Sequence, residues 1–202
     1  YKTKLGYSLQ YAEFVKHYVE THYDTVFDGD YKVSTPRVIS MIKISTSDIS
    51  NPTDAEKEKL EEVKELLKDG KNFGDVAKDY SDDSDTKSAK GSLGVVDKTS
   101  NLTNSYGNAI NESAFSLTEG QTSDVLTGND GYYILKCTST NKEKIKKKLK
   151  NITIQSPLLT YDDNIIYLAF NTYDIEYKDA KVKKAVKEAV KEGLKARAEE
   201  RK

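Results

Sequence analysis

An ordered series of short motifs between Phe73 and Leu135 constrains the fold of this chain more than any other feature. An amphipathic segment leads into an acidic, serine-rich stretch, and a Gly-x-Leu-Gly turn and a second amphipathic segment follow. Gly131 then opens an apolar run that is rich in strand-forming residues. Helical spacing that alternates with glycine turns and short apolar runs predicts an α+β fold in which helices surround a small sheet.

Further segments of this region have distinct strand and helix signals. Val38–Ile44 is rich in β-branched residues and predicts a strand, as do 125–126 and 132–137 around the turn 128–131. Thr53 or Asp54 can cap a helix that ends at Asp69-Gly70, and a short helix from Phe73 to Tyr80 follows. The polar stretch 81–90 is predicted to be a loop, and 104–115 a loop that enters a short helix.

The two ends of the chain are predicted to be helical. Residues 5–27 place apolar and tyrosine side chains three and four apart, and Asp28-Gly29-Asp30 is predicted to end that helix. Lys142–Lys150 is strongly basic and predicts a helix with a solvated face. The last segment carries a narrow apolar stripe at intervals of four, formed by Val182, Val186, Val190 and Leu194. A stripe of this kind needs a packing partner.

Composition limits the classes of function. The chain has 33 acidic and 32 basic residues, so no global field favours nucleic acid. Cys137 is the one cysteine, which excludes an internal disulfide and predicts a buried strand residue. No apolar run approaches the length of a membrane helix. The chain begins at Tyr1 rather than Met, so we expect a leader or anchor to have been removed.

Neither of the two possible metal-ligand groups has the spacing of a known site. His17 and His22 lie five apart, which does not place them on one helical face. The carboxylates around Asp83 lack the glycine and the terminal glutamate of an EF-hand loop at the required offsets. The sequence therefore predicts no metal and no cofactor.

Five of the motifs resemble, in order and spacing, those of the parvulin family of peptidyl-prolyl isomerases, in particular the PrsA-like foldases. The resemblance covers about half of the chain, through Lys68–Phe73, Ala77–Asp83, Gly91–Gly94, Phe115–Ser123 and Gly131–Ile134. It implies a parvulin-like module at residues 36–140 with a small antiparallel sheet. It also implies a separate helical, chaperone-like domain built from residues 1–35 and 141–202, in which the terminal segments pack together.

In parvulins an apolar pocket holds the proline ring, beside two histidines that face a Cys or Asp. Carried over residue by residue, the Cys or Asp position falls on Asp83, and the histidine positions fall on Met41 and Tyr133. The substrate-binding positions fall on Leu93, Tyr106 and Ile110, where Ile110 replaces an expected aromatic residue.

The loss of both histidines affects the expected activity. Tyr133 keeps a hydroxyl donor and Met41 keeps only bulk, so neither reproduces an imidazole. Loss of positioned polar groups costs on the order of 10²-fold in rate where they act in the transition state. The resemblance thus implies an isomerase site whose catalysis is weak or absent. The alternative is an active isomerase that uses Asp83 and Tyr133.

Three functions follow from these expectations. The first is an extracytoplasmic foldase and chaperone that binds unfolded secreted polypeptides and their X–Pro segments. The second is a true isomerase of low turnover, and the third is a surface interaction protein on a parvulin scaffold. The resemblance also implies attachment to the outer face of the cytoplasmic membrane of a Gram-positive bacterium, through a lipid anchor outside these residues.

Overall fold

The computed structural model describes residues 2–98, 100–155 and 170–200. The chain forms two compact units: Pro36–Ile145 is one, and Tyr1–Thr35 together with Lys146–Lys202 is the other. The predicted domain limits at 36 and 140 remain a proposal, which the fragment described below tests.

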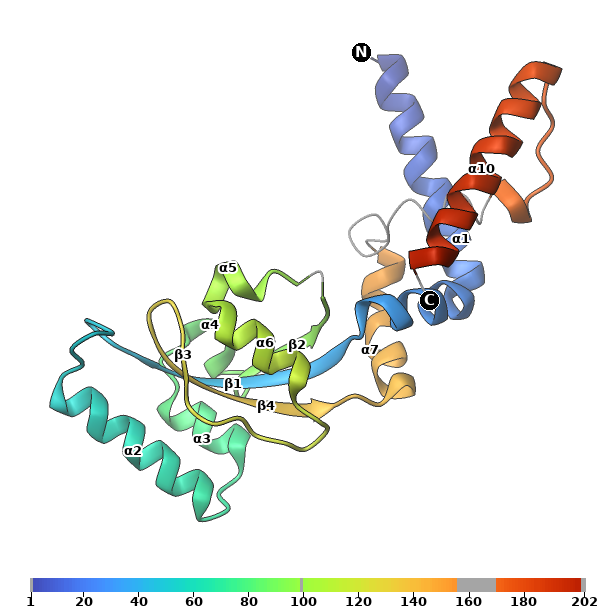
Figure 1. Cartoon of the computed structure of the whole chain (residues 1–202). Coiled ribbons are helices and arrows are strands. Elements are labelled where there is room, and N and C mark those ends of the chain that lie inside the picture. Colours follow the sequence, from blue (N-terminus) through green and yellow to red (C-terminus); the bar gives the residue numbers. More distant parts are fainter. Residues whose placement is uncertain (1, 99, 156–169, 201–202) are drawn as a thin grey trace. The chain divides into compact units, whose positions relative to one another are not determined.

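The unit Pro36–Ile145 is built on a four-stranded antiparallel sheet of order β2-β1-β4-β3 (Figure 1). The strands are β1 (Arg37–Ser45), β2 (Ser92–Val96), β3 (Leu126–Thr127) and β4 (Gly131–Ser139). The two long strands β1 and β4 are central and pair along most of their length. The predicted α+β fold with a small antiparallel sheet is confirmed.

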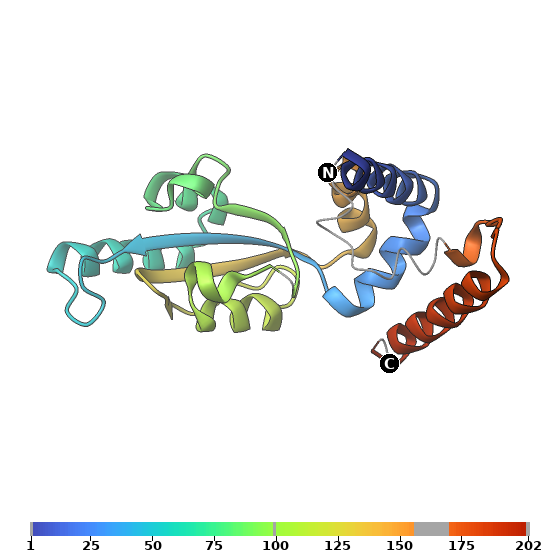
Figure 2. The same cartoon turned by 90° about the horizontal axis from the view of Figure 1, so that it is seen from above.

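Helices cover both faces of this sheet (Figures 1 and 2). On one face α2 (Asp54–Lys68) and α3 (Phe73–Tyr80) pack on a cluster that includes Ile42, Ile44 and Ile134. On the other face α5 (Leu102–Tyr106) and α6 (Asn108–Ser116) pack on a cluster that includes Ile39 and Leu135. Because both faces are covered, residues 38–42 of β1 are all buried, without the alternation of a strand with one wet face.

Local sequence signals set the ends of these helices. Thr53 caps α2 in a capping box with Glu56, and Gly70 follows the helix at φ +80°. Asn72 caps α3 by accepting hydrogen bonds from two backbone N–H groups. The predicted loop 81–90 contains one helical turn, α4 (Ser84–Lys87), and the predicted turn at 91–94 lies largely in β2.

The N-terminal helix α1 (Lys2–Ser34) is longer than predicted. Its backbone leaves helical angles only at His22, with φ −123° and ψ 25°, and the predicted end at Asp28-Gly29-Asp30 is wrong. A glycine costs only about 1 kcal/mol in a helix interior. The rings of Phe27 and Tyr31, one turn apart with centroids separated by 5.6 Å, pack across this glycine.

Two further helices are α7 (Lys142–Gln155), whose first residues belong to the unit Pro36–Ile145, and α10 (Ala180–Glu200). The predicted solvated face of α7 is present, since Lys144, Lys147 and Lys148 are exposed. Lys146 is instead half-buried, and its ammonium lies 3.1 Å from Asp24 and 3.7 Å from Asp28 of α1. Tyr23 also donates a hydrogen bond of 2.6 Å to the carbonyl of Lys146. None of the described helices is long and apolar enough to cross a bilayer.

The apolar stripe of α10 lines a groove together with the segment that precedes the helix. Val186, Val190 and Leu194 line this groove with Phe170 and Tyr173. The ring of Tyr173 in turn lies 5.5 Å from Phe14 and 5.9 Å from Tyr18 of α1, so N- and C-terminal segments contact one another within this unit.

A fragment of residues 36–145 is expected to fold on its own. Both hydrophobic clusters of the sheet consist of residues within this range, and a domain with its own core can fold independently. Circular dichroism and urea denaturation should show a cooperative transition. An unfolded fragment would contradict the domain limits, and comparison with residues 36–140 would test the contribution of Ile145, which is fully buried.

Candidate functional site

The predicted site residues come together on one face of the sheet. Met41 of β1 and Tyr133 of β4 are fully buried in the same cluster as Ile110 of α6. Leu93 of β2 and Tyr106 of α5 are partly buried and pack against this cluster. Five separate elements, through the long-range pairing of β1 with β4, therefore bring the five apolar and aromatic positions into one cluster.

Tyr133 is held by hydrogen bonding and by its neighbours. Its hydroxyl donates a hydrogen bond of 2.5 Å to Oδ1 of Asp130, and its ring centroid lies 5.9 Å from that of Tyr106 at an interplanar angle of 63°. Gly128 passes so close that a Cβ there would lie 2.4 Å from the Tyr133 ring. The turn before β4 thus closes over the tyrosine ring.

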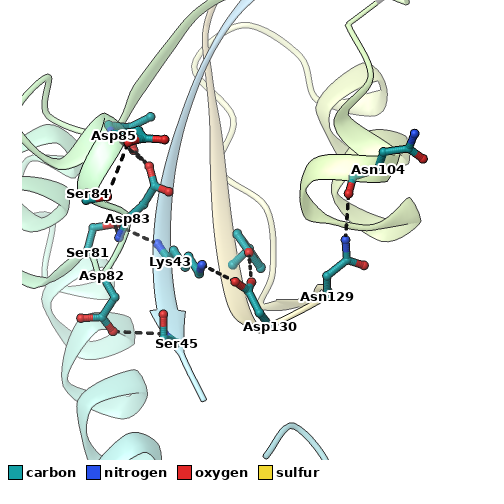
Figure 3. Close-up of polar contacts among 12 residues, drawn as sticks. Lys43, Ser45, Ser81, Asp82, Asp83, Ser84, Asp85, Asn104, Asn129 and Asp130 are labelled. Atoms are coloured by element: carbon teal, nitrogen blue, oxygen red, sulfur yellow. Dashed lines mark hydrogen bonds and ion pairs between the residues drawn. The ribbon is translucent and has the colours of Figure 1, made fainter. Parts of the chain in front are cut away.

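The sequence analysis missed a charged pair beside Tyr133, formed by Lys43 and Asp130 (Figure 3). Lys43 Nζ lies 2.5 Å from Asp130 Oδ2 and 6.0 Å from the centroid of the Tyr133 ring. The Lys43 side chain is only 14% exposed, while that of Asp130 is 58% exposed. A lysine between the two isoleucines of a largely buried strand was the signal, because a charge placed there requires a counter-ion.

Asp83 caps the short helix α4 at the edge of the site. Its Oδ2 accepts hydrogen bonds from the backbone N–H of Thr86 at 2.9 Å and from the Thr86 hydroxyl at 2.6 Å. The loop that carries Asp83 is fixed to β1, because Ser81 Oγ accepts from the Lys43 N–H and Asp82 N–H donates to the Lys43 carbonyl (Figure 3). Asp83 is therefore a positioned carboxylate with a structural role.

Burial and neighbouring charge set the protonation states of the site. Burial raises the pKa of Tyr133 well above its usual range, and the Asp130 and Asp83 carboxylates raise it further. The hydrogen bonds from Lys43 and Tyr133 lower the pKa of Asp130. Burial also raises the pKa of Tyr106, with a contribution from the Asp83 charge. At neutral pH Tyr133 is thus a neutral donor and Asp130 a charged acceptor.

We expect Tyr133→Phe to destabilise the protein by about 1 kcal/mol at pH 7, through loss of the hydrogen bond to Asp130. Because folding raises the Tyr133 pKa, its contribution to stability is present below the ordinary tyrosine pKa of about 10 and is lost as the pH rises above it. Urea denaturation should therefore show that the cost of Tyr133→Phe shrinks by roughly 1 kcal/mol at pH 11.

The control for this measurement is Tyr132→Phe, which makes the same change one residue earlier on β4, beside the other cluster. A cost of Tyr133→Phe that is the same at pH 7 and pH 11 would contradict the proposed protonation state.

Two of the carboxylates in this region are held by protein partners. Asp82 pairs with Lys59, with Nζ to Oδ1 at 2.5 Å, and Asp83 caps α4. Across the part of the chain that the structure describes, no group of three or more His, Cys, Asp or Glu side chains has a metal-binding arrangement. His22 stacks on the ring of Tyr18, with centroids 4.4 Å apart.

Residues 41–139 match the model of the rotamase family, the PPIC-type PPIase domain. The chain is 30% identical over 194 residues to the foldase protein PrsA of Staphylococcus aureus strain bovine RF122, and 29% identical to that of strain Newman. Each alignment covers 92% of this chain and 58% of the relative, so the chain spans little more than half the length of these relatives.

The crystal structure of PrsA from Bacillus subtilis has a similar fold. It matches 90% of this chain and 68% of its own length, with a TM-score of 0.50 and 23% identity. The motif series, the sheet order and these matches agree. Residues 41–139 form a PPIC-type peptidyl-prolyl isomerase domain of the parvulin kind, and the chain is similar to the PrsA foldases over most of its length.

Proposed function

We propose that this protein is a foldase that binds unfolded secreted polypeptides outside the cytoplasm, with a parvulin domain that grips X–Pro segments and isomerises them slowly or not at all. Rotation about a peptide bond has a barrier of about 18–20 kcal/mol, and the uncatalysed X–Pro step takes tens of seconds or more. A protein that holds such a segment during this step prevents its aggregation, even without accelerating the rotation.

The proposal rests on one observation: the Tyr133 hydroxyl already donates a hydrogen bond within the protein. It is the one polar group at the two former histidine positions, and it already donates its hydrogen to Asp130. Met41 is fully buried and has no hydrogen to donate. An X–Pro segment would therefore meet an apolar pocket formed at Leu93, Tyr106 and Ile110, with no free donor at either position.

A second candidate is an active isomerase that uses Asp83 and Tyr133. The charge of Asp83 contributes to the raised pKa of both Tyr133 and Tyr106, which supports a position close to the pocket. A carboxylate beside the bound X–Pro bond could disfavour the planar amide, as a positioned charge does in other sites. A surface interaction protein on the same scaffold is the third candidate.

We further propose that the protein works on the outer face of the cytoplasmic membrane of a Gram-positive bacterium, held by a lipid anchor outside this chain. Its kinship with PrsA foldases of Staphylococcus aureus supports this placement.

The deciding experiment compares wild type with Asp83→Asn, measuring X–Pro peptide isomerisation and aggregation of an unfolded client. Asparagine keeps an oxygen that can cap α4 and removes the charge, whereas Asp83→Ala also removes the cap, at a cost of about 1 kcal/mol. We expect suppressed aggregation and little isomerisation in both wild type and Asp83→Asn. A clear rate enhancement that Asp83→Asn loses would instead establish the isomerase, and failure of both assays would favour the interaction protein.

A further inference from the structure

A lysine-rimmed groove lies on the other face of the sheet from the candidate site. It has a volume of about 530 Å³ and is formed by the end of α2, the start of α3, residues 122–125 and β4. Ile134 and Phe73, which line it, belong to the cluster of the α2 and α3 face. Met41 and Tyr133 belong to the opposite cluster, so the groove is separate from the proline pocket.

The groove combines an apolar floor with positive charge at its rim. Four apolar side chains line it, namely Leu67, Phe73, Val125 and Ile134. Four lysines line it as well, against a single carboxylate, Asp124. A segment that filled this groove would bury apolar surface and also meet an excess of positive charge.

Three of these lysines are available to a ligand. Lys64 pairs with Glu61 at 2.6 Å, whereas Lys68, Lys71 and Lys136 have no carboxylate within 4.0 Å among the described residues. Lys68 and Lys71 are exposed, and Lys136 is half-buried with its ammonium 6.0 Å from the centroid of the Phe73 ring. Charges that lack partners attract anionic groups, and because these lysines are largely exposed, added salt screens that attraction.

From this complementarity we propose that the groove binds an acidic polypeptide segment that carries an aromatic or aliphatic side chain between its carboxylates. The apolar side chain packs on Leu67 and Val125, which are half-buried, above the buried Phe73 and Ile134. The carboxylates pair with Lys68, Lys71 and Lys136. The role of such a segment as part of a client protein rests on the proposed foldase function. Binding itself needs no proline and does not depend on isomerase activity.

The test is an NMR and calorimetric titration of the whole chain with the capped, proline-free peptide DEFDLE and its uncharged counterpart NQFNLQ. We expect DEFDLE to bind at least about tenfold more tightly, to shift the amide signals of Val125 and Ile134 more than that of Ile110, and to weaken as salt rises. Equal binding of the two peptides, or shifts centred on Ile110, would overturn the proposal.

A triple variant, Lys68→Gln with Lys71→Gln and Lys136→Gln, should bind DEFDLE about tenfold more weakly, since each exposed pair contributes a small increment. The matched control, Lys57→Gln with Lys78→Gln and Lys98→Gln, removes the same charge from lysines that do not line the groove and should retain the wild-type affinity within about twofold. If both triple variants lost the same affinity for DEFDLE, the effect would come from net charge alone and the proposed site would be refuted.

Thermal denaturation of both triple variants establishes that they are folded. A competition experiment adds inorganic phosphate or polyglutamate to the complex with DEFDLE. If either displaces the peptide as effectively as an excess of DEFDLE itself, the groove is a general anion patch without the apolar component, and the proposal is overturned. Neither X–Pro isomerisation nor client aggregation enters these measurements. Failure of this proposal is therefore distinguishable from failure of the foldase proposal.

Discussion

Introducing histidine at both positions aligned with the parvulin histidines, with Met41→His and Tyr133→His, is expected to raise kcat/KM on X–Pro peptides by on the order of 10²-fold. The two positions lie on the same face of adjacent paired strands, since Met41 pairs with Leu135 and Lys43 pairs with Tyr133. Imidazoles there can donate and accept hydrogen bonds, which methionine cannot, and Asp130 remains available as a partner for the second histidine.

The measurement is a protease-free isomerisation assay on a short X–Pro peptide, with a matched double variant that lacks imidazole, Met41→Leu with Tyr133→Phe. This control also loses the bond to Asp130 and keeps both positions apolar. Each single histidine variant should give a smaller gain than the pair. A double histidine variant that is folded yet no faster than the control would show that the carried-over site positions are wrong.

Gly91→Ala is expected to destabilise the parvulin domain by about 3 kcal/mol or more. Gly91 has φ +77°, and a Cβ there would lie 2.3 Å from the Met41 carbonyl oxygen and 2.9 Å from the Ala77 Cβ. The Gly91 carbonyl also accepts the Met41 N–H at 2.8 Å. Relief of the clash would therefore separate β2 from β1 beside the candidate site.

Gly94→Ala is the control for this prediction. Gly94 has the same φ of +77°, but no atom would lie within 4 Å of an added Cβ. Its cost should be confined to the backbone conformation, about 1–2 kcal/mol. Urea denaturation of both variants measures the difference, and equal costs would contradict the proposed close approach of Gly91 to β1.

Sequence alone predicts those parts of the fold that depend on local signals. The Thr53 cap, the end of α2 at Gly70 and the β-branched β1 are all local, and the structure confirms each one. The extension of α1 past Gly29 was not predictable in this way. It depends on ring packing between Phe27 and Tyr31, which can outweigh the modest helix cost of glycine.

The sequence predicts the positions of the candidate site but not their interactions, and the role of these positions stays a prediction. Motif spacing identified Met41 and Tyr133, and the sheet places them in one cluster. The pair of Lys43 with Asp130 joins residues far apart in the chain through the register of β1 and β4, which no local pattern specifies. The cap that Asp83 makes on α4 could not be predicted either, because the helix is a single turn within a polar stretch.

The alternation of side chains along β1 has a consequence for substitutions in such a domain. Ile42 and Ile44 point to the layer of α2 and α3, whereas Met41 points to the layer of α5 and α6. The sheet thus separates two hydrophobic cores, which use the same strands but different side chains. Substitutions in the layer that holds the candidate site can therefore change its chemistry while the other layer still supplies free energy of folding.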